Sequence, residues 1–197
     1  MSQAPHSTLN AETLCQISED ILVLARKQGA TAAEAAASTG KGLSVSVRLG
    51  EVESIEYNQD KGMGVTVYLG QSKGSASTSD FSRKAIAETV EAALTIARHT
   101  SADPFSGLAD PELFAREFPD LDLYHPWSID ADTAAELARR CEAAARDSDP
   151  RIHNSEGGSL GTSEGLSVYA NSLGFVGKRQ SSQHSLSCSV IAEDLKG

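Results

Sequence analysis

The residues best suited to chemistry are one serine in a glycine-rich stretch and five histidines spread along the chain. Residues 157–161 read GGSLG and match the G-x-S-x-G pattern. In hydrolases this pattern places a nucleophilic serine at a sharp turn from a strand into a helix. Here a strand pattern follows instead, because Leu166, Val168 and Ala170 alternate with other residues. We therefore interpret Ser159 as part of a glycine- and serine-rich turn, and a serine hydrolase using Ser159 is the least favoured function.

The histidines and cysteines do not form a metal-binding pattern. The histidines are widely separated, and no H-E-x-x-H helix brings two of them to one face. Cys15, Cys141 and Cys188 are equally scattered, so we expect neither a disulfide framework nor a C-x-x-C metal site. Gly62 and Gly64 lack the third glycine and the following helix of a phosphate-binding loop. We thus predict no catalytic residue, no metal ligand and no cofactor on this chain.

The overall charge is acidic, with a formal net charge of −10. Non-specific binding to nucleic acid or to an anionic membrane requires clustered basic residues, so we expect no direct contact with either. The N-terminus lacks the basic and apolar segments of a secretion signal, and no apolar run reaches the length of a membrane span. A cytoplasmic protein is therefore expected.

Alternating apolar residues predict a β-meander over residues 43–78. Every second residue from 43 to 49 is apolar, and the same alternation returns from 63 to 69, which is the period of a half-buried strand. The opposite face of the second run carries Gly64, Thr66 and Tyr68. The polar run 58–61 predicts a turn between the two strands. Residues 32–38, which are rich in alanine, predict a short strand before the meander.

Helices and a connector surround this meander. Apolar residues follow helical spacing over 11–28, over 83–98 and again after residue 130. Residues 103–129 hold four prolines in an acidic context and predict a connector. We predict an α+β fold of antiparallel meander sheets with three flanking helices, in two helix-plus-meander units. The predicted domains are an α+β unit at 1–102, the connector, and a helix with a second β region at 130–197.

Turns in this fold are expected at glycine or asparagine, which accept a positive φ. The predicted turn positions are Gly50, Gly62, Gly64, Gly74, Gly157, Gly158, Asn171 and Gly174. We expect these residues to shape connections between strands rather than to bind a ligand.

Several short strings, collinear along nearly the whole chain, resemble the N-terminal region of the PmbA (TldE) proteins. They include RLGEVE at 48–53, GVTVY at 64–68, SEGGS at 155–159 and HSLS at 184–187. None of these strings is diagnostic by itself, but their succession in one order is specific.

This resemblance implies a subunit of the TldD/TldE metalloprotease, also called peptidase U62 or modulator of DNA gyrase. A TldD-like partner would carry zinc on an HExxxH helix, whereas the PmbA-like subunit lacks these ligands and would be inactive alone. The implied substrates are unfolded peptides, and an implied role is maturation of a peptide antibiotic. Family members exceed twice this length, so we expect a C-terminal domain beyond residue 197.

Two other functions remain open. The chain could be a binding or assembly module without a link to proteolysis, or the serine hydrolase that uses Ser159. Capture of a TldD-like protein distinguishes the metalloprotease subunit from the assembly module. In the absence of a partner subunit, a homodimer is the assembly to test.

Overall fold

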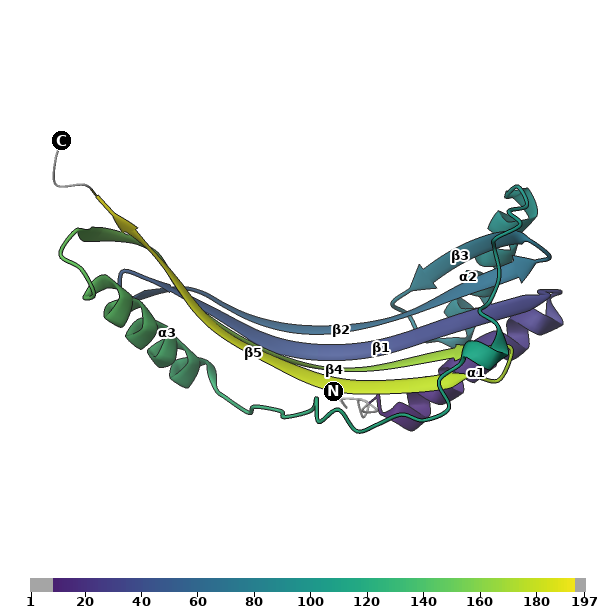
Figure 1. Cartoon of the computed structure of the whole chain (residues 1–197), viewed down its shortest axis with the longest axis horizontal. Coiled ribbons are helices and arrows are strands. Elements are labelled where there is room, and N and C mark those ends of the chain that lie inside the picture. The colour runs from purple at the N-terminus through teal and green to yellow at the C-terminus, as the bar shows by residue number, and fades with distance from the viewer. Residues whose placement is uncertain (1–8, 194–197) are drawn as a thin grey trace, which may run out of the picture. The chain divides into compact units, whose positions relative to one another are not determined.

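A computed structural model describes residues 9–193 and combines one β-sheet with three α-helices. The elements are α1 (Ala11–Lys27), β1 (Ala32–Arg48), β2 (Glu51–Leu69), β3 (Ser72–Thr78), α2 (Arg83–His99), the short 3-10 helix η1 (Pro111–Leu113), α3 (Ala131–Arg146), β4 (Ile152–Asn171) and β5 (Val176–Ala192) (Figure 1). The strand order is β3-β2-β1-β4-β5, and β2 pairs with β3 in antiparallel register. The predicted α+β class is confirmed, and the predicted meanders join into one sheet where β1 meets β4.

Two compact units interleave along the chain. Unit 1 contains the chain up to Thr39, Asp60–Leu121 and Leu166–Gln180, and unit 2 contains Gly40–Gln59, Asp122–Gly165 and the chain from Ser181. The strands β1, β2, β4 and β5 are each between 17 and 20 residues long, and each has one part in unit 1 and the other part in unit 2. The units therefore do not follow the consecutive ranges that the sequence predicts, since each long strand carries the chain from one unit into the other.

Unit 1 has an apolar core between its strands and the helices α1 and α2. Leu14 of α1, Val67 of β2 and Val90 of α2 are fully buried within one cluster. The side chain of Asn10 accepts a hydrogen bond from the Thr13 amide at 2.9 Å and caps α1. The predicted helical ranges, 11–28 and 83–98, each differ from the observed helix by one residue.

Unit 2 has a smaller core beneath α3. Val45 and Val47 of β1 and Leu160 of β4 pack against Ala134 and Ala138 of the helix. Because the helix presents alanines to the strands, its backbone can approach the sheet closely. This close approach leaves no room for a side chain at Gly158 of β4.

Gly50 lies in the turn between β1 and β2, and Gly174 lies in the turn between β4 and β5. Their φ values are +84° and +92°. Asn171 is the last residue of β4, and its side-chain oxygen accepts hydrogen bonds from the Leu173 and Phe175 amides at 3.0 and 3.2 Å. The asparagine side chain thereby orders the β4–β5 connection, which is a common use of this residue.

The predicted turns at Gly62 and Gly64 are wrong, because both residues lie inside β2. The polar run 58–61 also belongs to this strand. The Thr39 hydroxyl of β1 donates a hydrogen bond to the Asp60 carbonyl at 3.2 Å, so the two strands remain side by side through the polar run. Polar residues therefore mark solvent exposure here and not the end of a strand.

The predicted turns at Gly74, Gly157 and Gly158 are also wrong, because these residues lie in β3 and β4. A Cβ atom at Gly74 would overlap the Ala93 carbonyl of α2, and one at Gly158 would lie 2.6 Å from the Ala138 carbonyl of α3. These two glycines are thus required where a helix backbone crosses a strand. At Gly157 φ is +109°, a backbone conformation that glycine adopts readily because it has no Cβ atom.

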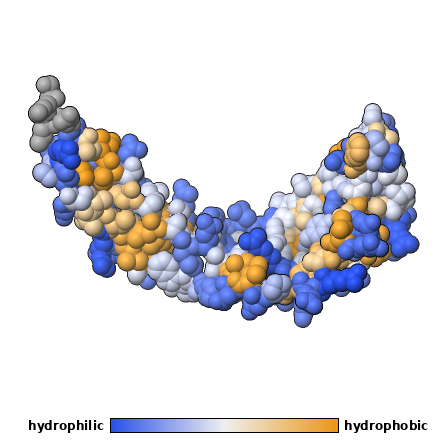
Figure 2. Space-filling model, in the orientation of Figure 1, coloured by the Kyte–Doolittle hydropathy of each residue, from blue (hydrophilic) through white to orange (hydrophobic). Residues whose placement is uncertain are grey.

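The connector 103–129 has little regular structure and keeps several apolar side chains at the surface. Phe114 packs against Phe175 with ring centroids 5.3 Å apart. Phe105 is 95% exposed and Leu113 is 79% exposed. On the face drawn in Figure 2, apolar patches are separated by hydrophilic ones. Among residues 9–193, no helix combines the length and apolar character needed to span a membrane.

Candidate functional site

The serine of the G-x-S-x-G match has no histidine beside its hydroxyl. Ser159 lies within β4, and its Oγ is 3.0 Å from the Oγ of Ser187. His184 instead contacts the Thr162 hydroxyl through Nδ1 and the His125 carbonyl through Nε2, both at 2.8 Å. A nucleophile elbow requires a strand that turns into a helix and a base that reaches the serine. Ser159 has neither feature.

Metal-binding donors do not gather in the described part of the chain. Within residues 9–193, no three side chains of His, Cys, Asp or Glu lie close enough to hold a metal ion. Cys15, Cys141 and Cys188 are free and partly buried. Burial raises the pKa of the Cys188 thiol, and the nearby Cys141 and Glu142 act in the same direction. These donors do not fit a zinc site, which requires three or four converging ligands.

Unit 2 contains a pocket of about 480 Å³ beside the connector. Its lining includes Tyr57, Trp127 and the ion pair between Lys41 and Glu164, whose Nζ and Oε1 atoms are 2.7 Å apart. Hydrogen bonds from Lys41 and Tyr124 lower the pKa of Glu164. The charge of this carboxylate is therefore already balanced by a lysine of the same unit.

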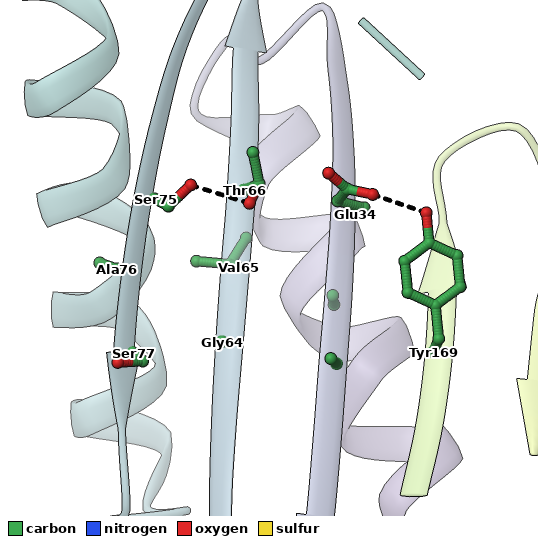
Figure 3. A pocket seen from close by; sticks show the side chains of 10 residues that line it. Glu34, Gly64, Val65, Thr66, Ser75, Ala76, Ser77 and Tyr169 are labelled. Atoms are coloured by element: carbon green, nitrogen blue, oxygen red, sulfur yellow. Dashed lines mark hydrogen bonds between the residues drawn. The ribbon is translucent and has the colours of Figure 1, made fainter. Parts of the chain in front are cut away.

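Unit 1 contains a second pocket, of about 360 Å³, on its part of the sheet. Figure 3 shows Glu34 and Tyr169 along one side and the hydroxyls of Thr66 and Ser75 along another. The two hydroxyl oxygens are 2.9 Å apart and satisfy each other. Small or apolar residues form the rest of the lining, and these are Ala35, Ala36, Gly64, Val65, Ala76 and Ser77. We call this site the Glu34 pocket.

Three adjacent strands position the carboxylate of the Glu34 pocket. The Tyr68 hydroxyl of β2 donates to Oε1 of Glu34 at 2.9 Å, and the Tyr169 hydroxyl of β4 donates to Oε2 at 2.6 Å. Burial, followed by the hydrogen bond and charge of Glu34, raises the pKa of Tyr68 to about 12. The same causes raise the pKa of Tyr169. Both phenols therefore remain protonated donors at neutral pH.

No sequence motif indicates the Glu34 pocket. Glu34 interrupts an alanine run, and Ala33, Ala35 and Ala37 on either side of it are buried. This alternation could have identified a polar position on the face opposite the core. Thr66 and Tyr68 lie on one predicted face of their strand, and both belong to this site. Their proximity to Glu34 depends on the order of the strands in the sheet, which the sequence does not show.

Two family models match the chain. The PmbA/TldA metallopeptidase domain 1 matches residues 33–97, and the PmbA/TldA metallopeptidase central domain matches residues 124–197. The Glu34 pocket draws residues from the first match and, through Tyr169, from the second.

Curated relatives are similar over most of this chain. The metalloprotease PmbA of Escherichia coli O157:H7 is 53% identical over 162 residues, which are 82% of this chain and 36% of the relative. The metalloprotease PmbA homolog of Haemophilus influenzae is 52% identical over 168 residues, which are 85% of this chain and 37% of the relative. The chain thus spans little more than a third of the length of these relatives.

Solved structures share the fold and, together with the sequence matches, place the chain in a family. A putative modulator of DNA gyrase from Bacteroides thetaiotaomicron has a TM-score of 0.84 at 25% identity, over 94% of this chain and 42% of that one. TldE from Thermococcus kodakarensis has a TM-score of 0.74 at 17% identity, over 92% of this chain and 40% of that one, which supports the fold. The chain therefore belongs to the PmbA/TldE family.

Proposed function

We propose that this chain is part of a PmbA/TldE-type subunit that works with a TldD-like metalloprotease subunit and does not itself hold the metal. The names of the curated relatives support a link to metalloproteolysis. The observation that carries the proposal is the match to two PmbA/TldA metallopeptidase domain models together with 53% identity to a metalloprotease PmbA. In this proposal the TldD-like subunit supplies the HExxxH helix, zinc and the hydrolytic step.

The role of this chain would then be to scaffold the assembly and contact peptides. A metalloprotease activates a water molecule on its metal, so hydrolysis requires ligands that the described residues do not bring together. Unfolded peptides are the proposed substrates, maturation of a peptide antibiotic is a proposed role, and the cytoplasm is the proposed compartment. The net charge of −10 favours cationic over anionic partners.

A reconstitution experiment tests this division of labour. The purified protein, a TldD-like subunit and their mixture are assayed for zinc by elemental analysis and for cleavage of an unfolded casein substrate. We expect zinc with the TldD-like subunit, co-elution of the two proteins and cleavage by the mixture. Stoichiometric zinc and cleavage in the purified protein alone would refute the proposal.

A binding or assembly module without proteolysis is the second candidate function. It is favoured by the Glu34 pocket, which is lined by the Glu34 carboxylate and the Tyr169 phenol and has no converging metal ligands. If the protein captures no TldD-like subunit and does not change its peptidase activity, this second function replaces the first. A Ser159 hydrolase would instead be revealed by labelling with a fluorophosphonate probe.

A further inference from the structure

Glu34 is a carboxylate whose hydrogen bonds come from neutral groups. Tyr68 and Tyr169 each donate one hydroxyl, and each oxygen of the carboxylate receives one of them. An ionised carboxylate has about four lone-pair sites, so two acceptor sites remain after both tyrosines are bound. The tyrosines fix the position of the charge without cancelling it.

No cation of the described chain neutralises this carboxylate. Ion pairs within residues 9–193 join other partners, and none of them includes Glu34. The corresponding carboxylate of the unit 2 pocket, Glu164, differs because Lys41 lies 2.7 Å away. A half-buried, uncompensated charge attracts a counter-ion more strongly than a charge in bulk water.

The remainder of the Glu34 pocket suits an apolar chain of small cross-section. Ala36, Gly64 and Ala76 present little side-chain bulk, and the hydroxyls of Thr66 and Ser75 are already bonded to each other. A neighbouring pocket of about 420 Å³ shares Ala36 and Gly64 with the Glu34 pocket and extends the available space along the same strands. The site therefore combines an anionic end with a lining that methylene groups can cover.

We propose that the Glu34 pocket binds the side chain of a lysine carried by an extended segment of a partner or peptide. The ammonium group would donate to the free acceptor sites of Glu34, and the lysine methylenes would cover Ala36 and Gly64. Tyr169, a residue that is 37% exposed, would border the cation with its ring (Figure 3). Acidic net charge of the whole chain would favour approach of such a segment.

Lysine fits this site better than the other biological cations. An arginine guanidinium carries five N–H donors, but only one acceptor site remains on each oxygen of Glu34, so its other donors would lie unpaired against the small and apolar lining. A peptide α-amine carries polar peptide groups directly behind its charge, and these would lie unpaired against the alanines of the pocket. An ammonium on four methylenes avoids both problems.

Binding can be measured by NMR on the purified protein labelled with 15N. The probe is the capped pentapeptide acetyl-Ala-Ala-Lys-Ala-Ala-amide, and comparison peptides replace lysine with Nε-acetyl-lysine or carry a free α-amine without lysine. We expect saturable shifts at the amides of Glu34, Gly64 and Ser75 with the lysine peptide. Affinity should fall at least about tenfold with either comparison peptide. It should also fall as salt screens the ion pair.

Two variants assign the effect to the carboxylate. Glu34→Gln removes the charge but keeps the shape, and it should weaken binding at least about tenfold. Glu88→Gln changes the net charge equally on α2 of the same unit, where the Glu88 carboxylate is 64% exposed and paired with Lys84, and it should leave the affinity unchanged.

Several results would overturn the lysine site. These are equal binding of the lysine and acetyl-lysine peptides, equal binding by Glu34→Gln, preference for the free α-amine, or no saturable shifts. The acetyl-lysine comparison uses the unaltered protein, so it remains decisive even if Glu34→Gln does not fold. The experiment needs neither a TldD-like subunit nor peptide cleavage, and it tests the lysine site separately from the proteolytic proposal.

Discussion

Glu142 of α3 is a buried carboxylate that holds the β1–β2 turn, and replacing it should destabilise unit 2. It is 1% exposed, and its two oxygens accept hydrogen bonds from the Leu49 and Gly50 amides, each at 2.8 Å. Leu49 has a φ of +52°, an uncommon conformation for leucine that benefits from this support. Glu142→Gln is the sharpest perturbation, because it keeps the size of the side chain and removes one acceptor.

The size of the effect follows from the number of acceptors. A glutamine amide has one oxygen and one NH2 group, so one of the two backbone amides would face another donor. Leaving a buried donor unpaired costs about 1–3 kcal/mol, and loss of charge-assisted bonding brings the total to about 2–4 kcal/mol. For a chain of this length, the midpoint of thermal unfolding should fall by roughly 5–15 °C.

The pH dependence of this effect has a defined sign. Burial would raise the pKa of Glu142, but hydrogen bonds from Ser155, Gly50 and Leu49 and the charge of Arg146 outweigh it, so the pKa is lowered. A lowered pKa in the folded state means that the stabilisation is complete above the unfolded value of 4.5 and is lost as the pH falls through the folded value. The stability difference between the native protein and Glu142→Gln should therefore shrink in acid.

Urea unfolding followed by tryptophan fluorescence reports this change in the correct unit. Trp127 is the single tryptophan of the chain, and it packs edge-on against His184 with ring centroids 5.5 Å apart in unit 2. Glu136→Gln is the matched control, because Glu136 lies on the same helix, is 61% exposed and should change stability by less than about 0.5 kcal/mol. Equal stability of Glu142→Gln and Glu136→Gln at pH 7 would refute this reasoning.

Further predictions concern other positions. Gly74→Ala should lower the thermal midpoint measured by circular dichroism, because its Cβ would collide with Ala93 of α2; an unchanged midpoint contradicts the observed helix contact. Because the pKa of Tyr68 is raised to about 12, its stabilisation is complete below pH 10 and lost as the pH rises through 12. The rise in phenolate absorbance near pH 12 should therefore be smaller in Tyr68→Phe than in the native protein. If this rise is unchanged, it comes from another tyrosine and the prediction is wrong. Ser159→Ala should leave fluorophosphonate labelling at background, whereas a loss of labelling would restore the serine hydrolase. Cys188, whose thiol pKa is raised by burial, should react with iodoacetamide more slowly than free cysteine, and equal rates would contradict its burial.

The sequence predicts the helices well because their signals are local. Asn10 and Ser82 cap α1 and α2 by accepting backbone hydrogen bonds within the first turn, and such caps can be recognised in the sequence. The long strand β2 is harder to predict. Its polar run 58–61 resembles a turn in composition, but pairing with β1 keeps it extended.

The candidate site could not be predicted because its partners are distant in sequence. Glu34 lies 34 residues from Tyr68 and 135 residues from Tyr169. The three side chains meet only because β1 lies between β2 and β4 in the sheet. Glycine shows the same limitation. The sequence predicts a turn at Gly74, but the role of this residue depends on the approach of α2, which no local pattern encodes.

Among three carboxylates that are fixed by hydrogen bonds, Glu142, Glu164 and Glu34, only Glu34 is available to a ligand. Glu142 is enclosed and bound by backbone amides, so its charge supports the fold. Glu164 is paired with Lys41, so its charge is balanced within unit 2. Glu34 is held only by the neutral hydroxyls of Tyr68 and Tyr169 and lines an open pocket. A carboxylate that is fixed in place, accessible and unbalanced keeps most of its attraction for an external cation, which is the condition that a lysine-binding site requires.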